Sequence, residues 1–296
     1  MRIGIAGAHA VRARGWLTAV RHVENAHLVG LWDVDHGRTL ATAKSLATQA
    51  FATLDDMLDQ VDAVVCVAEP IRQAALATKI VQAGKHILFG LPLSLDLEAG
   101  RAFEKTVTAS SVVAMGFTEE LFDPDQRLFL DFQQFRHVEE GSLTWTGHPL
   151  RTSGPGERAL AEVPDLLTEV LARAVPQFEW VFGPVTWLGV SPGREQTRWE
   201  VTLGHARDRV SSVYIETPAT SAGLTRRYEF RAGTKIDTRE SLGNGWVAAV
   251  AALEELGRSV GAGSVSVTSS WSTTRCVRAT EIAMQIKAAR AAATLA

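Results

Sequence analysis

The chain has 296 residues, of which 46% are hydrophobic and 21% are charged, a composition typical of globular proteins rather than of disordered or fibrous ones. This length exceeds one typical core and predicts two domains of about 100–200 residues each. The formal net charge of -3 argues against nucleic-acid binding, which normally requires a basic surplus on one face.

The first third of the chain alternates short apolar runs with segments of helical periodicity. Near-continuous Val, Ile and Leu runs that are separated by helices indicate parallel strands buried on both faces. The expected strands are 2–7, 26–35, 61–70, 85–92 and 111–117, and the expected helices are 14–23, 38–47, 53–60, 71–84 and 97–110. This order predicts a doubly wound, Rossmann-type parallel sheet.

After Phe117 the pattern changes to longer strands in which apolar and polar residues alternate. Alternation with period two indicates a mainly antiparallel sheet with one covered face and one open face. The expected strands are 142–149, 185–191, 197–206, 209–217 and 224–232, and the expected helices are 164–183, 245–260 and 271–296. We therefore predict an α/β protein with a Rossmann domain over residues 1–118 and an α+β domain with a large open-faced sheet over residues 119–296.

Three segments together indicate a family. The order of elements, with "VDAVVCVAEP", "QAGKHILFGLPLS" and "WVFGPV", resembles the Gfo/Idh/MocA family of NAD(P)-dependent sugar and polyol oxidoreductases. The resemblance covers nearly the whole chain. It implies a nicotinamide nucleotide bound to the first domain, a sugar or cyclitol bound against the second sheet, and hydride transfer between them.

The phosphate loop departs from the usual glycine pattern. The dinucleotide fingerprint uses glycines for a tight turn, for approach of the backbone to the pyrophosphate, and for helix packing. In "GAHAVR" only Gly7 fits, because His9 and Arg12 occupy the second and third glycine positions. Arg12 can offer a cation to a phosphate instead; the alternative is that this loop merely turns the chain.

Of two further positions on the cofactor side, one favours nucleotide binding and the other does not. Asp33 ends the second strand, where an acid can accept hydrogen bonds from ribose hydroxyls and disfavours a 2′-phosphate, so NAD is favoured over NADP. Alternatively, Asp33 or Asp35 caps the next helix. The resemblance implies a threonine before Pro70, where Glu69 stands, and a carboxylate there would repel a phosphate.

The residues that the resemblance makes catalytic are replaced. Its Glu-Lys-Pro signature aligns on Gly90, Leu91 and Pro92, so the lysine beside substrate and nicotinamide is Leu91, which supplies neither charge nor proton. The Asp and His of the second domain, and the Asp that follows them, align on Glu169, Arg173 and Pro176.

We identify the following cofactor-side positions: Gly7, His9, Arg12, Asp33, Glu69, Pro70 and Pro92.

Arg173 stays protonated at ordinary pH and cannot act as the general base that a histidine provides. Because Glu169 and Arg173 are four residues apart on a predicted helix, a surface ion pair is the simple alternative. Pro176 is expected to kink or shorten that helix.

Other polar residues could replace the missing groups on the open sheet face. The candidates are His148, Asp165, Tyr228 and His205. Histidine serves as an acid or a base near neutral pH, but a strand histidine is more often a surface residue. Trp145, Trp187 and Trp199 could stack on a sugar ring, although an interface or a core is the more common use of strand tryptophans.

Further sites and anchors are not indicated. No His-x-x-His or Cys-x-x-Cys spacing predicts a metal site. We interpret Cys66 and Cys276 as small buried apolar residues. No apolar run reaches the roughly 20 residues that span a membrane, and the N-terminus has no leader pattern. We expect a cytoplasmic protein without a membrane or nucleic-acid partner. The resemblance implies a homodimer or homotetramer formed through the second sheet.

Three functional hypotheses follow. The first is a diverged NAD(P)-dependent oxidoreductase that acts on a sugar, cyclitol or similar polyol with relocated acid/base groups. The second is a non-catalytic descendant, a pseudoenzyme that serves as ligand sensor, partner subunit or scaffold. The third and weakest is a non-redox lyase or isomerase that uses the old substrate pocket.

Overall fold

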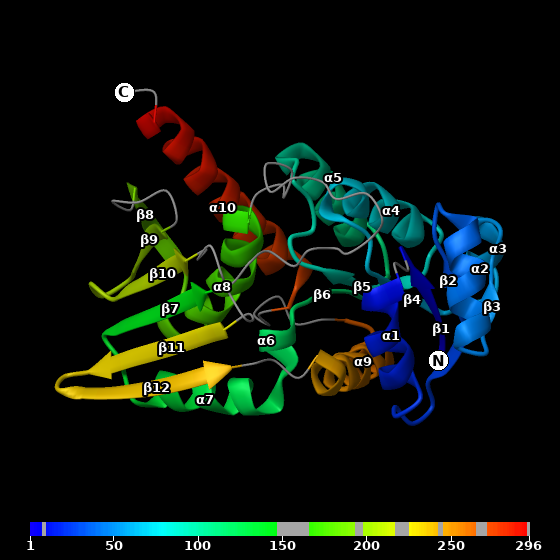
Figure 1. Cartoon of the computed structure of the whole chain (residues 1–296), viewed down its shortest axis with the longest axis horizontal. Coiled ribbons are helices and arrows are strands. Elements are labelled where there is room, and N and C mark those ends of the chain that lie inside the picture. The colour runs from blue at the N-terminus through cyan, green and yellow to red at the C-terminus, as the bar shows by residue number, and fades with distance from the viewer. Residues whose placement is uncertain are drawn as a thin grey trace. The chain divides into compact units, whose positions relative to one another are not determined.

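The computed structural model of the protein describes residues 1–7, 10–146, 166–192, 198–216, 225–241, 245–264 and 271–294 (Figure 1). The chain divides into two compact units, Met1–Pro124 with Asn244–Thr280, and Asp125–Gly243 with Glu281–Ala296. The domain boundary expected after residue 118 stays a prediction. In the structure, however, the segment Asn244–Thr280 groups with the first unit.

The first unit contains a parallel six-stranded sheet with the strand order β3-β2-β1-β4-β5-β6. Its strands are β1 (Arg2–Ala6), β2 (His27–Trp32), β3 (Gln49–Ala50), β4 (Ala63–Cys66), β5 (His86–Gly90) and β6 (Ala114–Phe117). Its helices are α1 (Ala10–Val20), α2 (His36–Ser45), α3 (Leu54–Leu58), α4 (Pro70–Gln82), α5 (Leu97–Thr108), α6 (Glu119–Phe122) and α9 (Gly245–Ala262). The predicted doubly wound sheet is confirmed.

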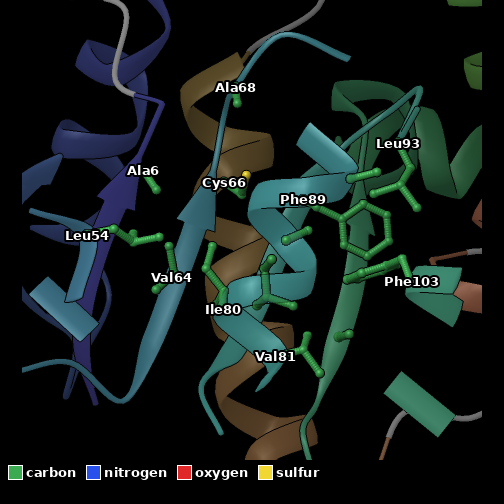
Figure 2. Packing of buried hydrophobic residues seen from close by; sticks show 14 of the residues in the cluster. Ala6, Leu54, Val64, Cys66, Ala68, Ile80, Val81, Phe89, Leu93 and Phe103 are labelled. Atoms are coloured by element: carbon green, nitrogen blue, oxygen red, sulfur yellow. The ribbon is translucent and has the colours of Figure 1, made fainter. Parts of the chain in front are cut away.

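Both faces of this sheet are buried, as the apolar strand runs predict. Alternate strand residues such as Ile3 and Ile5 pack with α1 and with α9, which joins this core from far along the chain. The opposite face packs with α3, α4 and α5, and Figure 2 shows Ile80 of α4 and Phe103 of α5 beside the strands. The rings of Phe89 and Phe103 meet edge to face, with centroids 5.2 Å apart.

The start of α10 (Thr273–Thr294) also packs into this second core. Cys276 lies against Gly116, where a Cβ atom would come within 2.2 Å of its Sγ. Burial raises the pKa of the Cys276 and Cys66 thiols to about 12, so both remain neutral packing groups, as expected.

The second unit contains a six-stranded sheet with the order β12-β11-β7-β10-β9-β8. Its strands are β7 (Glu140–Thr146), β8 (Val185–Pro192), β9 (Arg198–His205), β10 (Val210–Glu216), β11 (Thr225–Ala232) and β12 (Lys235–Ser241), and its helices include α7 (Pro124–Phe135) and α8 (Leu166–Phe182). Only β7 and β10 pair in parallel among these strands. The predicted α+β architecture with a mainly antiparallel sheet is confirmed.

One face of this sheet is covered by helices. Phe230 of β11 contacts Phe129 of α7 and both Phe178 and Phe182 of α8. Four elements have no counterpart among the expected ones: the short strand β3, the helices α6 and α7, and the edge strand β12. The edge strand is polar in sequence and largely exposed, so it lacks the apolar alternation that marks a half-buried strand.

Candidate functional site

The carboxyl ends of the strands of the first sheet place the cofactor-side residues along one edge. Gly7 follows β1, Asp33 follows β2, Glu69 follows β4, and Leu91 follows β5. In doubly wound sheets a ligand binds outside this edge, where the strand order reverses. Here the reversal lies between β1 and β4.

Gly7 fits the tight turn that a dinucleotide loop needs. Its φ is +77°, and a Cβ atom would lie 2.5 Å from the backbone nitrogen of Ala68. The Gly7 N–H donates to the Trp32 carbonyl over 3.0 Å. A side chain is therefore excluded at this position. His9 lies outside the described residues, and Arg12 lies in α1 with its side chain outside them.

The carboxylates of Asp33 and Asp35 accept different hydrogen bonds. Asp35 caps α2: its Oδ1 accepts from the Arg38 N–H over 3.0 Å, and its Oδ2 lies 3.0 Å from Arg38 Nε. Asp33 Oδ1 accepts from the Asp35 N–H over 3.1 Å. This bond holds the Asp33 carboxylate at the carboxyl end of β2, while the capping is done by Asp35.

Glu69 precedes the first turn of α4 without capping it. Its backbone is extended and its side chain makes no capping hydrogen bond, while Pro70 occupies the first helical position. Its carboxylate lies 3.8 Å from Arg72, and both side chains are largely exposed. An exposed ion pair of this kind contributes little stability, so the Glu69 side chain does little to hold the fold.

Leu91 is a core residue. It is 5% exposed and belongs to the apolar cluster between the sheet and α4 and α5. Its N–H donates to the Phe117 carbonyl over 3.2 Å, and a cis peptide bond joins it to Pro92. The side chain that replaces the expected lysine therefore contributes packing.

Gln73, which the sequence patterns did not single out, lies under this loop. It is 2% exposed, and its amide exchanges hydrogen bonds with the backbone of Gly90 and donates to Pro92. The available signal was a glutamine on the apolar face of α4, beside Ala74 and Ala77.

In the second unit, the predicted pair on α8 is confirmed. Arg173 Nη2 lies 2.9 Å from Glu169 Oε1, with the two side chains 30% and 34% exposed. Pro176 is buried, and α8 continues past it to Phe182, so the expected shortening is wrong. Gln177 donates to the Arg173 carbonyl over 3.1 Å, which gives the helix another polar contact beside the proline.

His205 and Tyr228 do not line the open face, so this expectation is wrong. Tyr228 is 1% exposed and shares the helix-covered face of β11 with Phe230. His205 is 3% exposed; Nδ1 lies 2.7 Å from the Gly183 carbonyl and Nε2 lies 2.9 Å from Ser211 Oγ. Burial lowers the pKa of His205, partly offset by its bond to Gly183. Both ring nitrogens of His205 therefore make contacts within the folded chain.

The remaining candidates lie elsewhere. His148 and Asp165 are outside the described residues. Among the three tryptophans, Trp145 is 9% exposed and belongs to the core, whereas Trp187 is 51% exposed. Within the described ranges, no group of three or more His, Cys, Asp or Glu side chains could hold a metal ion. None of the helices found in those ranges is long and apolar enough to cross a bilayer.

Comparison with known proteins identifies the first unit. Residues 1–117 match the GFO_IDH_MocA family model, described as an oxidoreductase family with an NAD-binding Rossmann fold. These residues belong to the Gfo/Idh/MocA family. The resemblance inferred from the strand and loop motifs is confirmed.

Two curated relatives each match part of the chain. Glucose-6-phosphate 3-dehydrogenase from Bacillus subtilis is 28% identical over 39% of this chain and 33% of its own length. UDP-N-acetylglucosamine 3-dehydrogenase from Acidithiobacillus ferrooxidans is 33% identical over 34% of this chain and 32% of its own length. The matched region therefore spans about one third of each relative.

Solved structures extend the likeness to the second unit. Myo-inositol dehydrogenase from Corynebacterium glutamicum aligns over 97% of this chain and 95% of its own, with a TM-score of 0.80 and 14% identity. At this identity the likeness concerns the fold alone. The likeness of fold to this solved dehydrogenase thus extends over both units.

Proposed function

We propose that the protein is a nicotinamide-nucleotide-dependent oxidoreductase that acts on a sugar, a cyclitol or a similar polyol, with its acid/base groups relocated. The observation that carries this proposal is the Gfo/Idh/MocA match over residues 1–117, together with Gly7 and Asp33 at the carboxyl edge of the sheet. The substrate class is carried over from the relatives, whose names are those of sugar and cyclitol dehydrogenases.

NAD is the favoured cofactor in this proposal. When bound, a nicotinamide nucleotide accepts or supplies a hydride. The Asp33 carboxylate would accept hydrogen bonds from the ribose hydroxyls, and its charge would repel a 2′-phosphate. Gly7 leaves room for the backbone to approach the pyrophosphate, since any side chain there would collide with Ala68.

Proton transfer cannot follow the usual route. Leu91 has no titratable group and lies in the core, and Arg173 is a permanent cation paired with Glu169. We propose His148 or Asp165 as the acid/base group, because the other candidates, His205 and Tyr228, lie in the core of the second unit.

A non-catalytic descendant is the second candidate. It is supported by the surroundings of the two residues that the resemblance aligns with catalytic ones: Leu91 lies in an apolar core and Arg173 forms an ion pair. Such a protein would bind a nucleotide or a sugar without turnover. A non-redox lyase or isomerase has no observation of its own in its favour. For each candidate we propose a homodimer or homotetramer formed through the open face of the second sheet.

The deciding experiment is a titration of the purified protein with NADH and NADPH, followed by nicotinamide fluorescence and by calorimetry. We expect low-micromolar binding that is tighter for NADH, and Asp33→Asn should reduce this preference. A screen of sugars and cyclitols for turnover then separates the oxidoreductase from the non-catalytic candidate. Absence of binding at millimolar nucleotide would overturn the proposed cofactor.

A further inference from the structure

Gln73 contacts the backbone of three residues at the carboxyl edge of the first sheet, Gly90, Pro92 and Leu93. It lies on the buried side of α4, 2% exposed, while its polar atoms point into the loop that follows β5. Its partners are 17 to 20 residues away in the chain. Burial of an amide is costly unless its hydrogen bonds are made, so these contacts require this loop conformation.

The amide binds the loop backbone at several points. Nε2 lies 2.7 Å from the Gly90 carbonyl oxygen, 3.0 Å from that of Pro92 and 3.4 Å from that of Leu93. Because an amide nitrogen carries two hydrogens, the two shorter contacts are its main bonds. Oε1 accepts from the Gly90 N–H over 3.2 Å. One side chain thus fixes the backbone on both sides of Leu91.

Gly90 leaves the space that this contact needs. A Cβ atom at residue 90 would lie 3.3 Å from Gln73 Oε1, closer than a normal van der Waals contact. The resemblance implies a glutamate at this position, and its side chain would press on the amide. The Gln73 amide thus fits closely against a residue 90 that has no side chain.

The loop lies on a defined side of the cofactor edge. The strand order reverses between β1 and β4, and a dinucleotide lies across that reversal. Asp33, on the β2 side, would meet the adenosine ribose. Residues 90–93 follow β5 on the other side, where the nicotinamide half would lie.

We propose that Gln73 is a positioning residue for the nicotinamide half of the nucleotide. It acts through the backbone of residues 90–93, which it holds in one conformation before the ligand binds. Preorganisation of this kind lowers the cost of ordering a loop on binding. The inference rests on the proposed nucleotide-binding function and names a determinant of it.

The test compares NADH with ADP-ribose, which lacks the nicotinamide ring, in calorimetric titrations of the full-length chain. Gln73→Leu should weaken NADH about tenfold and change ADP-ribose by less than about twofold, because only the loop beyond β5 is released. Gln82→Leu is the matched control, since Gln82 is exposed on the same helix, and it should leave both affinities unchanged.

Each outcome of these titrations supports or overturns the positioning role of Gln73. Equal weakening of NADH and ADP-ribose, or no weakening of either, overturns the positioning role while leaving the proposed function intact. Failure of the unsubstituted protein to bind either ligand overturns both proposals. If Gln73→Leu does not fold, Gly90→Ala replaces it, because the added Cβ displaces the amide gently; a selective loss of NADH affinity supports the role, and its absence refutes it.

Discussion

The loop after β5 and the α8 helix depart from the family pattern in opposite ways. After β5, the expected lysine is an apolar residue, Leu91, that lies in the core. On α8, the expected histidine is Arg173, a permanent charge held by Glu169. A general acid or base must exchange a proton during the reaction, which neither an aliphatic side chain nor a guanidinium does. The residue that the resemblance aligns with the lysine is thus apolar, whereas the one aligned with the histidine is charged and paired.

The two regions also differ in how the new residue is stabilised. Leu91 packs within a buried apolar cluster. The side-chain hydrogen bond beside it is made by the buried Gln73. Arg173 remains partly solvated, 30% exposed, and its pair partner lies one helical turn away. We therefore expect a substitution at Leu91 to cost much more stability than one at Glu169 or Arg173, because burial magnifies the cost of a mismatched group.

Leu91→Lys should show the largest effect. A lysine in this cluster must bury its ammonium group or push the loop outward, and we expect a loss of about 2–4 kcal/mol in the free energy of unfolding, measured with denaturant. Ile71→Lys, at a side chain that is 76% exposed, is the control and should change stability by less than about 0.5 kcal/mol. Strong sugar oxidation by Leu91→Lys alone would show that Arg173 and Pro176 are not disabling.

His205→Leu tests whether a mismatched side chain in the core of the second unit costs as much stability as one in the Leu91 cluster. The substitution leaves the Gly183 carbonyl and the Ser211 hydroxyl without the imidazole, so we expect a loss of about 2–3 kcal/mol in thermal or denaturant unfolding. His27→Ala, at an exposed histidine, should have almost no effect. A loss of turnover at unchanged stability would instead restore His205 as a catalytic residue.

Mild acid should destabilise both units through two imidazoles, the buried His205 and the partly buried His86. Burial lowers the pKa of His205, and it lowers the pKa of His86, where the nearby Asp62 acts in the opposite direction. His86 Nδ1 accepts from the Val113 N–H over 3.0 Å, which requires a neutral ring. Because the unfolded histidines take up protons first, stability is full above about pH 6.5 and falls as the pH drops below it.

The acid effect can be separated from carboxylate titration. Arg2 holds the pKa of Asp62 below its usual value, so the stability from that pair is present above about pH 4 and is lost as the pH falls further, through the lowered pKa. Unfolding midpoints measured between pH 7 and 5 therefore report the histidines. His86→Gln keeps an acceptor for Val113 and should flatten the profile; an unchanged slope in this variant would exclude His86 as a contributor.

Glu169→Gln should show the smallest effect. A partly exposed pair four residues apart on a helix contributes about 0.3–0.5 kcal/mol, and salt screens it. We expect the difference from the unsubstituted protein, followed by denaturant unfolding, to shrink further in 1 M salt. A loss as large as that of Leu91→Lys would mean that α8 is as intolerant as the loop, and the contrast between the two regions would fail.

Local sequence patterns determined much of this protein. The apolar runs predicted the parallel strands, since a strand buried on both faces needs apolar residues at every position. The spacing of Glu169 and Arg173 predicted their ion pair, because residues four apart meet on a helix. The loop motifs led to the family of residues 1–117.

The tertiary structure decided what depends on residues far apart in the chain. Period-two alternation tells which strand residues share a face but not which face the helices cover, so His205 and Tyr228 were assigned to the wrong one. The packing of α9 on the first sheet and the contacts of Gln73 with residues 90–93 join distant segments. Such contacts arise from the packing of whole elements, and no local period encodes them.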